Sequence, residues 1–88
     1  MQTLKAPPLE RLLEPLARAL TPAAARAVVA FRADPETQAR IAELADKGNE
    51  GQLGPEEREE YEAFVRGIDL IAILQSQARR LLAKTRKR

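Results

Sequence analysis

The side chains that most often carry catalysis are scarce in this sequence. It contains neither histidine nor cysteine, so the usual proton carrier near neutral pH, the thiolate nucleophile and the commonest transition-metal ligands are missing. Asp and Glu number 13, but a working acid–base pair needs one carboxyl group buried so that its pKa rises. Asp69, inside an apolar stretch, is the one carboxyl group placed for burial, and it could equally face water or an arginine. We therefore predict that the chain is not an enzyme.

A twelve-residue stretch from Asp46 to Glu57 has the spacing of a calcium-binding EF-hand loop. Its ligand positions one, five, seven and twelve are Asp46, Glu50, Gln52 and Glu57. Position three is Gly48, which has no side-chain oxygen, and losing a ligand weakens calcium binding. The alternative needs no metal, because the glycines make a turn and the glutamates interact favourably with the start of the next helix. We expect no cofactor and keep calcium as the alternative.

The net charge of +2 conceals three segments of opposite sign. Residues 1–33 carry +3, residues 34–62 carry −7 and residues 63–88 carry +6. Charge separated in this way affects the choice of partner and the rate of association more than the fold.

A dense basic cluster occupies the carboxyl end of the chain. Its members are Arg79, Arg80, Lys84, Arg86, Lys87 and Arg88. One interpretation is a solvated helix end, where cations interact favourably with the helix dipole. The other is a surface that binds the phosphate backbone of nucleic acid without reading its sequence. With one Tyr, two Phe and no Trp available to stack on bases, the first interpretation is favoured.

The stretch from Ile68 to Leu74 is apolar nearly all the way round a helix, and a helix of this kind is covered on more than one side. Short helices of the same chain, a second copy or another protein could cover it. We predict a partner-binding surface in which apolar side chains supply affinity and glutamates steer a basic partner. Its apolar members are Ile68, Leu70, Ile71, Ile73 and Leu74, and its acidic members are Glu56, Glu59 and Glu60.

Four prolines mark the expected helix starts, because proline suits the first helical turn. They are preceded by a proline, a threonine, an aspartate and a glycine, in the pairs Pro7-Pro8, Thr21-Pro22, Asp34-Pro35 and Gly54-Pro55. Thr21 and Asp34 are expected to cap their helices, and Gly48 to end the third helix in the left-handed conformation. Pro15 indicates either a kink in the first helix or its true start. These patterns predict an all-α fold in which three short helices pack on one long C-terminal helix.

A chain of 88 residues can bury only a thin core, and without disulfides it would gain stability from self-association. We expect a single helical domain over residues 1–83 and a basic tail over residues 84–88, with a dimer as one of the open alternatives. The amino terminus is not followed by an apolar run, so we expect a cytoplasmic protein with no membrane partner.

Three stretches resemble a group of short uncharacterised bacterial proteins that are often encoded beside a gene for an HNH-type nuclease. They are Leu20–Glu36, Glu50–Glu62 and Asp69–Gln75, within a similarity that covers residues 20–83. Gly54 stands where the group has a threonine cap. The resemblance implies an accessory or antidote subunit that binds the neighbouring nuclease.

Overall fold

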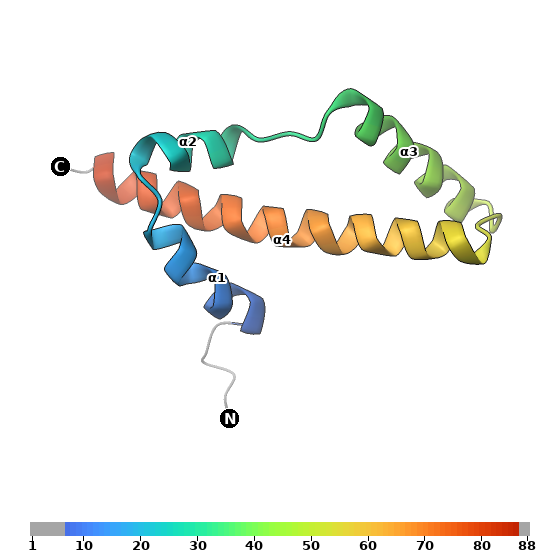
Figure 1. Cartoon of the computed structure of the whole chain (residues 1–88), viewed down its shortest axis with the longest axis horizontal. Coiled ribbons are helices and arrows are strands. Elements are labelled where there is room, and N and C mark those ends of the chain that lie inside the picture. The colour runs from blue at the N-terminus through green and yellow to red at the C-terminus, as the bar shows by residue number, and fades with distance from the viewer. Residues whose placement is uncertain (1–6, 87–88) are drawn as a thin grey trace. The chain divides into compact units, whose positions relative to one another are not determined.

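The computed structural model describes residues 7–86, with side chains from Pro7 to Lys84, and over this range it contains four helices and no strand. The helices are α1 (Pro8–Arg18), α2 (Pro22–Ala30), α3 (Pro35–Asn49) and α4 (Pro55–Arg86) (Figure 1). The predicted all-α architecture is confirmed, since α1, α2 and α3 pack against the long helix α4. No helix in this part of the chain is long and apolar enough to cross a membrane.

Each helix begins at the proline that the sequence indicated. Thr21 Oγ1 accepts a hydrogen bond of 3.1 Å from the backbone N–H of Ala24, and Asp34 Oδ1 accepts one of 2.7 Å from that of Thr37. Both predicted caps are therefore confirmed. Pro15 lies inside α1, which starts at Pro8, so the alternative of a helix starting at Pro15 is wrong.

The end of α3 corrects the prediction for Gly48. The helix continues through Asn49, and Gly51, with φ of 70°, is the residue in the left-handed conformation. The N–H groups of Gly51 and Gln52 donate to the carbonyls of Gly48 and Lys47 at 3.1 and 2.8 Å, which is the Schellman pattern. Gly48 has a different role, because a Cβ atom there would meet Leu53 Cδ1 at 3.3 Å.

The chain divides into two compact units, and α4 contributes to both. Residues 1–31 and 70–88 form the first, which we call the basic unit, and residues 32–69 form the second, the acidic unit. The predicted domain of residues 1–83 thus contains two units. The expected start of a tail at residue 84 is not a helix boundary, because α4 continues to Arg86.

The acidic unit joins α3 to the first half of α4 through one leucine and a set of ion pairs. Leu44 of α3 is fully buried. Arg40 makes a bidentate contact with Glu60 at 2.7 and 3.0 Å, and Lys47 Nζ lies 2.7 Å from Glu57 Oε2. All four partners are charged side chains that reach between α3 and α4.

The basic unit packs α1 and α2 on the second half of α4 with small side chains. Its buried apolar residues are Ala17, Ala25 and Ala78, one from each helix, and small side chains allow helices to approach closely. Gln77 of α4 is also buried, and its Nε2 atom donates to the carbonyl of Glu10 in α1 at 2.9 Å.

Candidate functional site

The predicted partner-binding stretch of α4 is partly exposed. Ile68, Leu70 and Ile71 keep 46%, 40% and 36% of their surface exposed, whereas Ile73 and Leu74 are half-buried. Ile68 belongs to the acidic unit and the other four belong to the basic unit. The helices of the chain therefore leave apolar surface uncovered along this stretch.

Two of these side chains line an apolar hollow in the basic unit. Its lining consists of Ala27, Val28, Phe31, Ile71 and Leu74, and its volume is about 320 Å³. Phe31, which directly follows the last residue of α2, keeps 48% of its surface exposed. Since all five lining side chains are apolar, the group that this apolar hollow accepts most favourably is an apolar one, such as a leucine or isoleucine side chain.

One glutamine holds the end of α2 beside the apolar hollow. Gln75 Nε2 of α4 donates to the carbonyl oxygens of Val28 and Phe31 at 3.1 and 3.0 Å. Carbonyl groups in the last turn of a helix lack their usual intrahelical donors, so Gln75 supplies a donor from another helix. These bonds fix the α2 end, and with it Phe31, against α4.

The acidic members of the predicted surface differ in their surroundings. Glu56 and Glu59 are exposed, and no ion pair to them is present among the described residues. Glu60 instead bonds Arg40, and this hydrogen bond lowers the pKa of the Glu60 carboxyl group. Glu56 and Glu59 are thus available to an incoming partner, whereas Glu60 already holds α3.

The EF-hand-like stretch does not assemble a calcium site. Because α3 continues through Asn49, its first four positions, beginning with Asp46, are helical. At the twelfth position, Glu57 accepts a hydrogen bond from Lys47, which lowers the pKa of the Glu57 carboxyl group. Glu50 and Gln52 are exposed, and residues 7–86 hold no cluster of three or more His, Cys, Asp or Glu side chains that could bind a metal.

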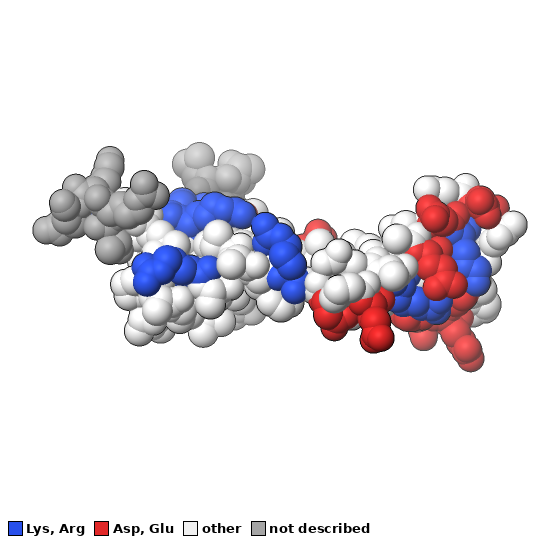
Figure 2. Space-filling model, turned by 90° about the horizontal axis from the view of Figure 1, so that it is seen from above, with Lys and Arg blue, Asp and Glu red and all other residues white. Residues whose placement is uncertain are grey.

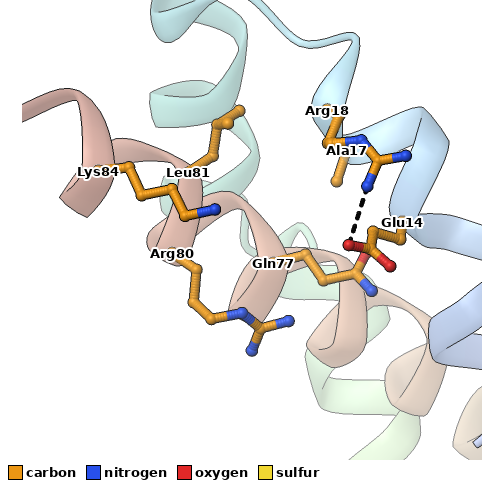
Figure 3. A pocket seen from close by; sticks show the side chains of 7 residues that line it. All are labelled: Glu14, Ala17, Arg18, Gln77, Arg80, Leu81 and Lys84. Atoms are coloured by element: carbon orange, nitrogen blue, oxygen red, sulfur yellow. Dashed lines mark hydrogen bonds and ion pairs between the residues drawn. The ribbon is translucent and has the colours of Figure 1, made fainter. Parts of the chain in front are cut away.

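The predicted basic cluster contributes to a second hollow in the basic unit, of about 180 Å³ (Figure 3). It is lined by Glu14, Ala17, Arg18, Gln77, Arg80, Leu81 and Lys84. Figure 3 shows Arg80 and Lys84 extending from α4, with the Arg18–Glu14 pair on the facing helix α1. We call this the basic hollow.

The other members of the basic cluster stand apart from this hollow. Arg79 is exposed and does not line it. Arg86 is the last residue of α4, and Lys87 and Arg88 lie outside the described residues. Asp69, the acid placed for burial by its sequence context, is exposed.

Sequence reasoning missed an apolar surface on α1. Leu9, Leu12 and Leu16 remain exposed, whereas Ala17 beside them is buried and Leu13 is half-buried. The sequence signal was the width of the leucine stripe, because one neighbouring helix covers only part of so broad a face.

Charge separates between the two units as it does along the sequence. Figure 2 shows Lys and Arg over the basic unit, whereas over the acidic unit Asp and Glu gather with Lys and Arg side chains among them. Comparisons with protein-family models, with curated proteins and with solved structures find no match to this chain.

Proposed function

We propose that this chain is a non-enzymatic helical interaction module that binds another protein through the apolar hollow of its basic unit. The observation that supports the proposal is the imbalance of apolar exposure. Among the described residues, eight large apolar side chains are exposed, whereas Leu44 is the one large apolar side chain that is fully buried. Phe31 and Ile71, two of the eight, line the apolar hollow together, and a contiguous exposed apolar surface is typical of a protein interaction site.

The apolar hollow supplies affinity and the charged side chains around it supply selectivity. Burying one leucine or isoleucine side chain contributes about 1.5–3 kcal/mol, and a few such anchors dominate most interfaces. Charged groups affect the association rate and exclude wrong partners more than they add affinity.

The resemblance to proteins encoded beside nuclease genes makes the neighbouring nuclease the partner to test first. The exposed carboxylates of Glu56 and Glu59 suit a basic partner surface, such as a groove that binds nucleic acid. An accessory or antidote role follows if binding changes the activity of the nuclease.

The test is retention of a partner from the native bacterial lysate by an immobilised chain. The double variant Ile71→Asp/Leu74→Asp should lose a stoichiometric protein that the wild type retains at high salt. The variant Ala72→Asp is the matched control, because Ala72 is exposed on α4 and lies outside the apolar hollow. Circular dichroism checks that each variant is helical, and Ile71→Asp alone replaces the double variant if that variant unfolds. Retention by a folded Ile71→Asp variant would contradict the proposal.

The basic hollow supports a second candidate function, the binding of nucleic acid. Arg18, Arg80 and Lys84 bring positive charge from two helices to one place, where a phosphate group would be attracted. Replacing both Arg80 and Lys84 with glutamine should weaken binding of an oligonucleotide and flatten its salt dependence. Arg79→Gln should have a smaller effect, because Arg79 does not line the basic hollow. Equal effects from these substitutions would contradict a site at the basic hollow.

A further inference from the structure

The two units of the chain carry opposite charge. Among the described side chains, six basic and two acidic ones give the basic unit a net charge of +4, and five basic and eleven acidic ones give the acidic unit −6. A surface that docks on the basic unit is therefore favoured if it is acidic, and each unit repels a second copy of itself.

The acidic unit carries exposed apolar side chains next to carboxylates, which is the combination that the apolar hollow of the basic unit would accept. Val65 and Ile68 are 38% and 46% exposed, and they lie on one face of α4 because they are three residues apart. The exposed carboxylates of Glu62 and Asp69 flank them in sequence. The acidic unit thus presents apolar side chains in acidic surroundings.

We propose that a second copy of this chain occupies the apolar hollow, with the acidic unit of each copy docked on the basic unit of the other. The inference rests on the proposed function, because it assigns a second copy of the chain to the same apolar hollow, where another protein would have to displace it. Ile68 of one copy enters the hollow beside Phe31 and Ile71 of the other. Two such contacts, related by a two-fold axis, make a closed dimer, which is the commonest form of protein self-association.

The ion pairs inside the acidic unit leave a separate set of carboxylates for this contact. Glu57 and Glu60 already bond Lys47 and Arg40 of α3. Glu56, Glu59 and Glu62 are exposed and have no ion pair among the described residues. They face the basic side chains of the second copy, which include Arg79, Arg80 and Lys84. The predicted acidic surface and the predicted basic cluster are then two halves of one interface.

Self-association also compensates for the thin core. The basic unit buries three alanines and one glutamine, and small chains without disulfides gain stability by covering apolar surface with a partner. The dimer covers Phe31 and Ile71 of the basic unit and Val65 and Ile68 of the acidic unit.

Charge reversal combined with mixing tests the proposal. One variant carries Glu56→Lys, Glu59→Lys and Glu62→Lys, and the other carries Arg79→Glu, Arg80→Glu and Lys84→Glu. Counted over the described side chains, three reversals bring the acidic unit to a net charge of 0 in the first variant and the basic unit to −2 in the second. Masses are measured by sedimentation equilibrium between about 10 µM and about 1 mM protein, since self-association depends on concentration. Circular dichroism confirms that both variants remain helical.

The wild type should sediment at twice the 9.8 kDa mass of one chain, and its dissociation constant should rise about tenfold or more when salt screens the charges. Each reversed variant alone should be a monomer, and an equal mixture of the two should restore the dimer. A helical variant that still dimerises alone, or a mixture that stays monomeric, overturns the proposal. Ile68→Asp is a further variant, and a dimer unaffected by it would also overturn the proposal.

A monomeric wild type separates the two proposals. If the chain is monomeric but retains another protein in a manner that depends on Ile71, self-association is wrong and the proposed function stands. If the chain is monomeric and its retention of another protein does not depend on Ile71, both proposals are wrong.

Discussion

The acidic and basic units hold their helices together by different means. In the acidic unit, Leu44 of α3 is fully buried, and Arg40 and Lys47 form ion pairs between α3 and α4. In the basic unit, three alanines allow close approach, and Gln75 and Gln77 of α4 donate to backbone carbonyls of α2 and α1. The ion pair described within the basic unit, Arg18–Glu14, is confined to α1.

This difference indicates which unit depends more on a partner. The acidic unit uses a large apolar side chain for its own packing, whereas the basic unit leaves Leu9, Leu12, Leu16 and Phe31 exposed. Hydrogen bonds from glutamines fix the positions of α1 and α2 without covering these side chains. The basic unit therefore has well-placed helices and uncovered apolar surface, which is the combination that a docking site needs.

The largest expected effect is at the core of the acidic unit. Leu44→Ala should destabilise the fold by about 2–5 kcal/mol, because it removes a fully buried side chain and leaves a cavity. The matched control Leu12→Ala, at an exposed site, should change stability by less than about 0.5 kcal/mol. Urea denaturation followed by circular dichroism measures both, and equal effects would contradict the assigned core.

The corresponding test in the basic unit is at Gln75. Gln75→Ala should cost about 1–3 kcal/mol and loosen the end of α2, because it removes a donor that bridges from α4 to the carbonyls of Val28 and Phe31. Gln75→Glu should be worse at neutral pH, since a carboxylate would face carbonyl oxygens, and acid should partly restore it by supplying an O–H donor. Amide hydrogen exchange in α2 is the measurement, and unchanged protection in both variants would show that Gln75 does not hold this helix.

A smaller effect of opposite sign is expected at Gly67. A Cβ atom there would meet nothing within 4 Å, so Gly67→Ala should stabilise α4 by about 1 kcal/mol. Thermal unfolding measures the change. A destabilised variant would mean that another chain packs closely at this position, and its dependence on protein concentration would identify that contact.

The ion pairs of the acidic unit predict a dependence of stability on pH. Hydrogen bonds from Lys47 and Arg40 lower the pKa values of Glu57 and Glu60 below their ordinary 4.5. Their contribution to stability is therefore fully present above pH 4.5 and is lost as pH falls through the lowered pKa values. Denaturant midpoints between about pH 6 and about pH 3 should fall less steeply in Arg40→Gln than in the wild type. Arg58→Gln is the control, and a wild-type slope in Arg40→Gln would contradict the pairing.

The sequence was sufficient for the features that local chemistry decides. Prolines marked the helix starts, and the caps at Thr21 and Asp34 follow from side chains that reach a backbone N–H group three residues away. The apolar pattern of residues 68–74 also indicated that side chains such as Ile68 and Ile71 could stay exposed. A helix that is apolar all round needs more neighbouring helices than a short chain provides.

Contacts between distant parts of the chain could not be predicted in the same way. Arg40 bonds Glu60, 20 residues away, and Gln75 bonds Val28, 47 residues away. Neither partner follows from spacing, so the paired state of Glu60 and the apolar hollow beside Gln75 became visible only in the fold. The prediction assigned the left-handed conformation to Gly48, whereas Gly51 adopts it. The sequence alone did not distinguish them, because either glycine can take this conformation after a helix.

The most direct test is a distance measurement between two copies of the chain. The sequence has no cysteine, so Ala63→Cys, at an exposed position beside the carboxylates of the contact, provides a single site for a spin label on the acidic unit. Spin-labelled chains at natural isotope abundance are mixed with wild-type chains that are enriched in ¹⁵N and carry no spin label. NMR then records which amide signals of the ¹⁵N-enriched chains are broadened by the spin label of the other copy. We predict broadening at Ala27, Phe31 and Ile71 in the basic unit and little at Leu44. Broadening that is absent, or that is equal at Leu44 and around the apolar hollow, would contradict docking of one copy's acidic unit on the other's basic unit.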